Sequence, residues 1–170
     1  TVGENEYITP NEFSVLIVFQ QSNGSSNDGF NIVTKLFKYN SNTVISNEFQ
    51  FPFNSYDANN TTPVIAYAKN NQGYNANKIV IVYRFEENGY EGLYRTTGAI
   101  NNNAIVWDSI GLPILSATAN SFNPTIEKSY VLNGGTYKFH LAWEERDNEY
   151  QSRIVYKYWD LINNLLHESN

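Results

Sequence analysis

Two pairs of adjacent carboxylates are the residues of this chain best suited to chemistry. Glu86-Glu87 and Glu144-Glu145 each follow a predicted β-strand, at equivalent places in the sequence. Glycoside hydrolysis normally needs two carboxyl groups about 5 to 9.5 Å apart across a sugar. A rim of carboxylates could also bind sugar hydroxyls or Ca²⁺. Adjacent acids in a loop are more often a solvated face, and we favour that interpretation.

Arginines and tyrosines accompany the acids. Arg84 and Arg146 flank the two pairs, and we expect them to be ion-pair partners of the carboxylates rather than a clamp for an anionic sugar. Tyr90 and Tyr150 lie in predicted loops, where a flat ring could stack on a sugar. We therefore predict no catalytic residue, no metal site and no cofactor, with Ca²⁺ as the one exception considered. The candidate ligand-binding residues are Glu86, Glu87, Tyr90, Glu144, Glu145, Arg146 and Tyr150.

Other reactive groups are few. The chain has no cysteine, which excludes disulfides and thiolate chemistry. Its two histidines, His140 and His167, have no companion acid at ligand spacing, and His140 is predicted to lie on a strand face. The sequence contains no nucleophile elbow, phosphate-binding glycine loop or zinc-protease motif.

The segments that must position these residues repeat along the chain. Pro63 is followed after 20 residues by Tyr83, and Pro124 after 19 residues by Trp143. Each aromatic closes a short apolar run, and Phe19 closes a third such run near the start. The intervals between the three aromatics are 64 and 60 residues. A repeat of this length predicts three copies of one supersecondary structure, covering residues 1–62, 63–123 and 124–170.

Each copy is predicted to contain four β-strands. The runs are short, rich in β-branched and aromatic residues, and separated by Asn, Ser and Gly. We therefore expect an all-β fold of three four-stranded antiparallel blades of a β-propeller, with the first strand of the first blade truncated. Two β-sandwiches of about 85 residues each are the alternative. The best helix candidate, residues 158–167, is interpreted as two strands around a turn at residues 163–164.

One known family is similar to this pattern. Residues 93–97 (LYRTT) and 105–109 (IVWDS), followed by the Pro-Ile-Leu of residues 113–115, resemble the blades of sialidase-like propellers with bacterial neuraminidase repeats. The resemblance implies a propeller of about six or more blades, so three copies would be a part or a self-assembling half of a ring. It also implies an Asp box, but residues 96–103 do not carry its Asp and Gly in register.

Charge and composition limit the kinds of partner that the protein can bind. The net charge of −6 and the lack of a Lys/Arg cluster argue against nucleic acid, and the same charge disfavours anionic membranes. No apolar run approaches the roughly 20 residues that cross a bilayer, so we expect no membrane insertion. The Cys-free, Met-free, Asn- and Tyr-rich composition is typical of secreted or cell-surface bacterial proteins.

The resulting hypothesis is a non-catalytic module that binds a carbohydrate or a protein partner at the cell surface. The two alternatives are a fragment of a sialidase-like glycoside hydrolase and a structural subunit. The subunit would form homo-oligomers through the unpaired edges of its blades.

Overall fold

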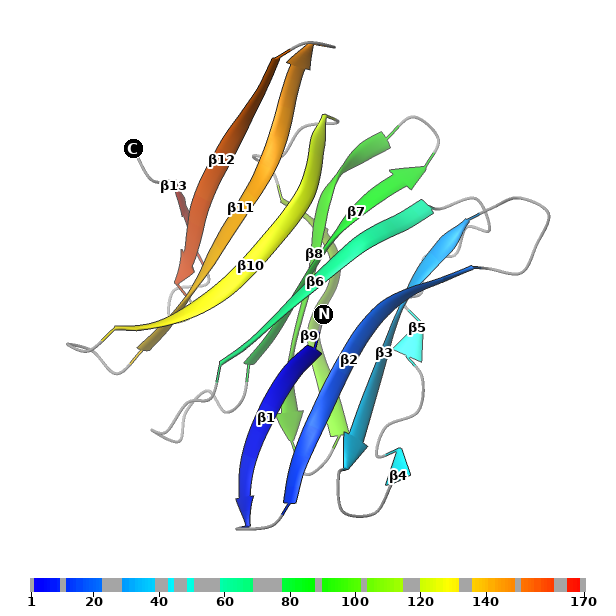
Figure 1. Cartoon of the computed structure of the whole chain (residues 1–170), viewed down its shortest axis with the longest axis vertical. Coiled ribbons are helices and arrows are strands. Elements are labelled where there is room, and N and C mark those ends of the chain that lie inside the picture. The colour runs from blue at the N-terminus through cyan, green and yellow to red at the C-terminus, as the bar shows by residue number, and fades with distance from the viewer. Residues whose placement is uncertain are drawn as a thin grey trace.

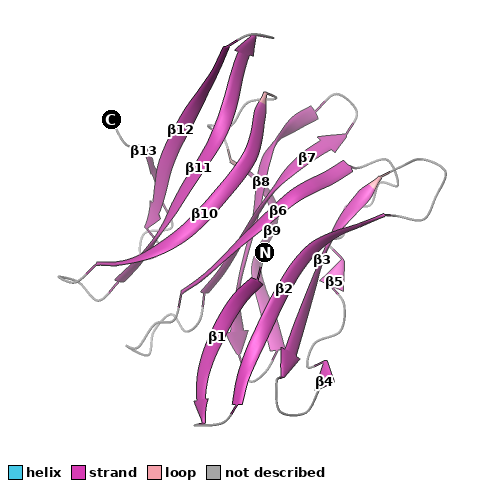
Figure 2. Cartoon of the chain, in the orientation of Figure 1, coloured by secondary structure: helices cyan, strands magenta, loops and turns pink. Residues whose placement is uncertain are grey.

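The computed structural model describes most of the chain. The described residues are 2–9, 12–22, 29–38, 43–44, 49–50, 59–68, 78–87, 90–101, 104–114, 120–131, 136–148, 151–160 and 165–168. Their regular structure consists of strands alone, with no helix among them (Figure 2). The predicted all-β class is therefore confirmed.

Thirteen strands make up the described fold. In chain order they are β1 (Val2–Thr9), β2 (Glu12–Ser22), β3 (Phe30–Lys38), β4 (Thr43–Val44), β5 (Phe49–Gln50), β6 (Asn59–Ala68), β7 (Lys78–Glu87), β8 (Tyr90–Asn101), β9 (Ala104–Pro113), β10 (Ser121–Val131), β11 (Thr136–Asn148), β12 (Gln151–Asp160) and β13 (Leu165–Glu168).

The strands form two hydrogen-bonded sheets. One has nine strands, in the order β1-β2-β3-β6-β7-β8-β9 with β4 and β5 also paired to β3, and the other has the order β10-β11-β12-β13. All pairs are antiparallel except β3 with β6, which meet in parallel at the single pair Phe30 and Asn59. Neither sheet closes on itself. We call β1–β5 the first unit, β6–β9 the second and β10–β13 the third.

The prediction of three separate four-stranded sheets is thus wrong in its count. The first unit has three long strands and two of only two residues, and the bridge at Phe30 joins it to the second unit. The predicted antiparallel strands are confirmed in the second and third units, where four successive strands pair in order. β6 and β10 begin at Asn59 and Ser121, a few residues before the predicted borders of the repeats.

Two other expectations are decided by the strand positions. The alternative of two β-sandwiches needs a border near residue 85, but this residue lies inside β7, which pairs with β6 and β8. The sandwich alternative is therefore wrong. Residues 158–160 belong to β12 and residues 165–167 to β13, which pair with each other. The strand interpretation of this segment is confirmed, and its turn at residues 163–164 lies outside the described residues.

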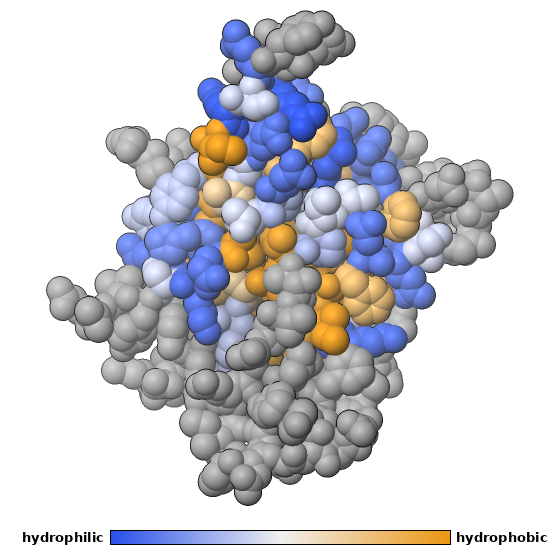
Figure 3. Space-filling model, in the orientation of Figure 1, coloured by the Kyte–Doolittle hydropathy of each residue, from blue (hydrophilic) through white to orange (hydrophobic). Residues whose placement is uncertain are grey.

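The second unit lies between the other two, as Figure 1 shows. In β7, Ile79, Ile81 and Tyr83 belong to a buried cluster with Leu16, Val18 and Ile32 of the first unit. Val80 and Val82 of β7 belong to a second cluster with Phe139, Leu141 and Trp143 of the third unit. Since successive side chains of a strand point to opposite faces, β7 is buried on both sides. On the face that Figure 3 shows, apolar residues gather near the middle of the view, with hydrophilic residues above them and to both sides.

A bulge recurs before the proline of the second and third units. Thr62 has φ 49° and Asn123 has φ 50°, and each directly precedes Pro63 or Pro124. The register of β6 with β7 shifts between Thr61 and Val64, and that of β10 with β11 between Phe122 and Thr125. An extra residue in one strand bends it and increases its twist. The repeat is therefore preserved in backbone geometry as well as in residue type.

Replacing Thr62 with asparagine is expected to stabilise the protein. A β-branched residue is strained at positive φ, whereas asparagine tolerates it, as Asn123 does at the equivalent place. Thr62 is exposed, and the hydrogen bond from its backbone N–H to Gln20 Oε1 does not involve its side chain. We expect a gain of about 0.5–1 kcal/mol in the free energy of unfolding, measured by urea titration.

A matched control uses Thr125, which is also exposed and lies on β10 without positive φ. Thr125→Asn should leave stability unchanged or lower it, because asparagine is a poor strand residue. Equal effects of the two substitutions would contradict a conformational origin.

Candidate functional site

The four candidate carboxylates lie inside strands, which corrects the expectation that they follow strands as loop residues. Glu86 and Glu87 end β7, opposite Glu91 and Tyr90 of β8. Glu144 and Glu145 lie within β11, opposite Ile154 and Arg153 of β12. Adjacent strand residues point to opposite faces, so the two acids of a pair cannot converge on one ligand. Pairing between strands continues past the apolar run because arginines offset the charge of the acids: Arg84 pairs with both Glu86 and Glu91, and Arg153 lies opposite Glu145.

The side chains of the two tyrosine candidates, Tyr90 and Tyr150, lie outside what the structure describes. Tyr90 begins β8, and its side chain lies outside the described residues, as does the whole of Tyr150. Their assignment as ligand residues stays a prediction.

Glu145 is a buried carboxylate with a structural set of partners. Its relative exposure is 4%. The indole Nε1 of Trp143 donates to Oε1 at 3.1 Å. Arg153 Nε and Nη2 donate to Oε2 at 3.1 and 2.8 Å. These bonds join β11 to β12 and hold the indole of Trp143, so the described contacts of Glu145 are internal to the third unit.

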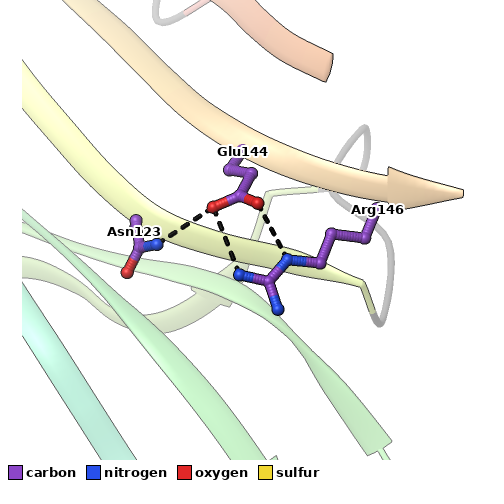
Figure 4. Close-up of polar contacts among 3 residues, drawn as sticks. All are labelled: Asn123, Glu144 and Arg146. Atoms are coloured by element: carbon purple, nitrogen blue, oxygen red, sulfur yellow. Dashed lines mark hydrogen bonds and ion pairs between the residues drawn. The ribbon is translucent and has the colours of Figure 1, made fainter. Parts of the chain in front are cut away.

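Glu144 lies on the opposite face and is held by a second arginine (Figure 4). Arg146 Nε donates to Oε1 at 2.8 Å, and Asn123 Nδ2 of β10 donates to Oε2 at 3.1 Å. Hydrogen bonds from Arg146, and then from Ser152 and Asn123, lower the pKa of Glu144 to about 2. The carboxylate is therefore ionised over almost the whole accessible pH range, which suits an ion pair and not a proton donor.

Glu144 is expected to make stability depend on acid pH. Its folded pKa of about 2 lies below its ordinary value of 4.5, so its contribution is complete above 4.5 and falls as the pH drops toward 2. We expect Glu144→Gln to be less stable than the wild type at neutral pH, with the difference shrinking steadily between those two values. Urea unfolding of both proteins at a series of pH values measures this. A difference independent of pH would contradict the ion pair.

One aromatic ring links the two acidic regions. The guanidinium carbons of Arg84 and Arg146 lie 4.3 and 4.6 Å from the centroid of Phe122. Arg84 also donates from Nη2 to Glu91 Oε2 at 2.7 Å, and its Nη1 lies 3.8 Å from Glu86 Oε2. The contact of these two arginines with Phe122 connects β7 of the second unit with β10 and β11 of the third.

The expectation that Arg84 and Arg146 pair with the neighbouring acids is confirmed. Phe122, Asn123 and Arg153 are contact residues that sequence reasoning missed. The first two precede Pro124 in the recurrent bulge, and this repeated position is the signal that could have identified them.

A second arginine–aromatic contact lies between the same units. The Arg95 guanidinium carbon of β8 lies 4.0 Å from the ring centroid of Trp159 on β12, and burial lowers the pKa of Arg95. Trp159 and Trp143 belong to the buried cluster shared by the two units. Trp143, one of the three repeated aromatics, thus fills the space between the second and third units.

Two searches complete the description of the site. Within the described ranges, no three His, Asp or Glu side chains come together as they would to hold a metal ion. The described part of the chain also has no helix of the length and apolarity needed to span a membrane. Comparisons with protein-family models, with curated proteins and with solved structures found no match to this chain. The fold and the contacts define the class as an all-β protein of antiparallel sheets that pack through buried apolar clusters and cation–π contacts.

Proposed function

We propose that the chain is a non-catalytic, propeller-like module of a secreted or cell-surface protein, and that it serves in protein interaction or carbohydrate binding. The observation that carries this proposal is that most of the candidate binding residues already have partners inside the fold. Glu86 forms an ion pair with Arg84, and Glu144, Glu145 and Arg146 form hydrogen bonds with partners within the fold. Carboxylates committed to arginines within the second and third units are not arranged as an acid and a nucleophile on either side of a sugar.

The packing of the units supports a propeller-like arrangement. The second unit is an antiparallel sheet of four consecutive strands with neighbours on both faces, as a blade within a propeller has. The third unit repeats its strand order. The relation to sialidase-like blades is part of this proposal.

Two exposed apolar residues of β12 favour a protein partner over a sugar. Val106, Ile110 and Leu112 of β9 and Ile154 and Tyr156 of β12 are the large apolar residues that stay exposed in the described part of the chain. Ile154 and Tyr156 lie on one strand two positions apart and so share a face. Apolar groups gathered on one sheet face are typical of surfaces that bind protein.

An activity assay tests the proposal. The purified chain is incubated with a fluorogenic sialoside and with aryl glycosides of neutral sugars, beside an active sialidase as positive control. We expect no turnover. Hydrolysis that is lost in Glu86→Gln or Glu144→Gln would overturn the proposal, because it would give these carboxylates a catalytic role.

A further inference from the structure

The outer face of the third unit has residues at positions that, in the first and second units, pack against the next sheet. In all three units the residue after the repeated aromatic is paired across the ladder with a branched apolar residue. Gln20 pairs with Ile32, Arg84 with Leu93, and Glu144 with Ile154. Ile32, Leu93 and Ile154 are therefore equivalent positions on the third strand of their sheets.

The exposure of these three residues differs sharply. Ile32 is 0% exposed and packs in the cluster shared with the second unit. Leu93 is 1% exposed and packs in the cluster shared with the third unit. Ile154 is 74% exposed. The same position is thus buried in the first and second units, each against the next unit, and it is exposed in the third.

The repeated aromatic shows the complementary pattern at the other end. Tyr83 is 0% exposed and Trp143 is 1% exposed, each buried against the preceding unit. Phe19, at the equivalent place in the first unit, is only partly buried, with Lys35 Nζ 5.7 Å from its ring centroid. Ile17, two positions away on the same face, is also partly buried. The outer faces of the first and third units therefore carry equivalents of the two halves of the internal contact.

From this continuity we infer that the outer face of the third unit, centred on Ile154 and Tyr156, docks a second copy of this chain. The first unit of that copy packs there through the face that carries Phe19, in the same way as the third unit packs on the second within one chain. The inference rests on the proposed function and gives the partner for it. It is a head-to-tail contact, which closes a ring or extends a filament according to the rotation between copies.

The contact is expected to be weaker than the internal ones. His140 and Ala142 stand where the second unit has Val80 and Val82, so the outer face is more polar. His140 Nε2 lies 2.5 Å from Ser129 Oγ, and its Nδ1 contacts the hydroxyl of Tyr156. In the first unit Val33 is already buried, which confines the contact there to the region of Ile17 and Phe19. A face of this kind predicts reversible, concentration-dependent association.

Sedimentation velocity of the whole chain over a wide range of concentration tests the inference. The wild type is expected to associate as concentration rises. Ile154→Asp should raise the dissociation constant at least about a hundredfold, because it would bury an unpaired carboxylate in the contact. Val106→Asp is the matched control, since Val106 is another exposed branched residue, on β9, and this variant should associate like the wild type.

A mixing experiment distinguishes head-to-tail from symmetric contact. Phe19→Asp should also prevent self-association, while an equimolar mixture of Phe19→Asp and Ile154→Asp chains should form a dimer through the one intact pair of faces. Circular dichroism confirms that each variant is folded. Should Phe19→Asp fail to fold, Lys35→Asp takes its place on the same face.

Three results would overturn the inference: a wild type that stays monomeric at its highest attainable concentration, an Ile154→Asp variant that associates normally, or a Phe19→Asp variant that self-associates. The glycoside assays are run on the same samples. A monomer without hydrolase activity would remove the docking inference alone, whereas hydrolysis would remove the proposed function.

Discussion

Replacing Trp143 with alanine is expected to lower the free energy of unfolding by about 3–5 kcal/mol, the range for removing a large buried aromatic. Trp143 is 1% exposed and lies in the cluster that joins the second and third units. Its indole also donates a hydrogen bond to the buried Glu145. The substitution therefore leaves a cavity between two sheets and removes one partner of a buried carboxylate. Urea unfolding followed by far-ultraviolet circular dichroism measures the change.

The matched control for this prediction is Ile154→Ala on the neighbouring strand. Ile154 is 74% exposed, so its truncation should change the stability of the monomer by no more than about 0.5 kcal/mol. The comparison is made at low concentration, where self-association does not contribute. A loss below about 1 kcal/mol for Trp143→Ala would contradict the packing of the third unit on the second.

The recurrence of Phe19, Tyr83 and Trp143 made the strand plan predictable. Each aromatic lies on the second long strand of its unit, and the apolar runs before Tyr83 and Trp143 lie in β7 and β11 as predicted. Periodicity identifies strands well because one buried side chain at a fixed place is needed in every copy to fill the contact between sheets. The same logic distinguishes β7, a continuous apolar run buried on both faces, from β11, where His140 and Ala142 interrupt the run.

Strand ends and contacts between units were not predictable in the same way. Glu86 and Glu144 were interpreted as loop residues because charged pairs usually face solvent. Arg84 and Arg146 instead stabilise them inside strands, and both guanidinium groups contact Phe122. Each arginine stands two residues from its acid on the same strand, so the two side chains share a face only once the strand has formed. The bridge between Phe30 and Asn59 depends on how the first two units pack, and no local sequence pattern predicts it.

Gly98→Ala is expected to destabilise the protein by about 1–3 kcal/mol, the usual cost of overpacking a tight site. A Cβ at Gly98 would lie 2.7 Å from the backbone oxygen of Val106 and 2.9 Å from Cε3 of Trp107. Trp107 is the cross-strand partner of Gly98, and it packs against the cluster shared by the first and second units. Because one obstacle is backbone, a rotamer change of Trp107 cannot relieve the clash alone.

The effect of Gly98→Ala should therefore reach beyond one strand pair. Moving β9 away from β8 would displace Trp107 from the cluster. It would also weaken the pairing of β8 with β9 at the register shift beside Gly98. Ala99→Ser, at the next residue of β8, is the control and should stay within about 0.5 kcal/mol of the wild type. Thermal unfolding of both variants gives the measurement. A neutral Gly98→Ala would mean that β9 can move away freely, and would contradict the close packing of Trp107 over β8 on which the contact between the first two units partly depends.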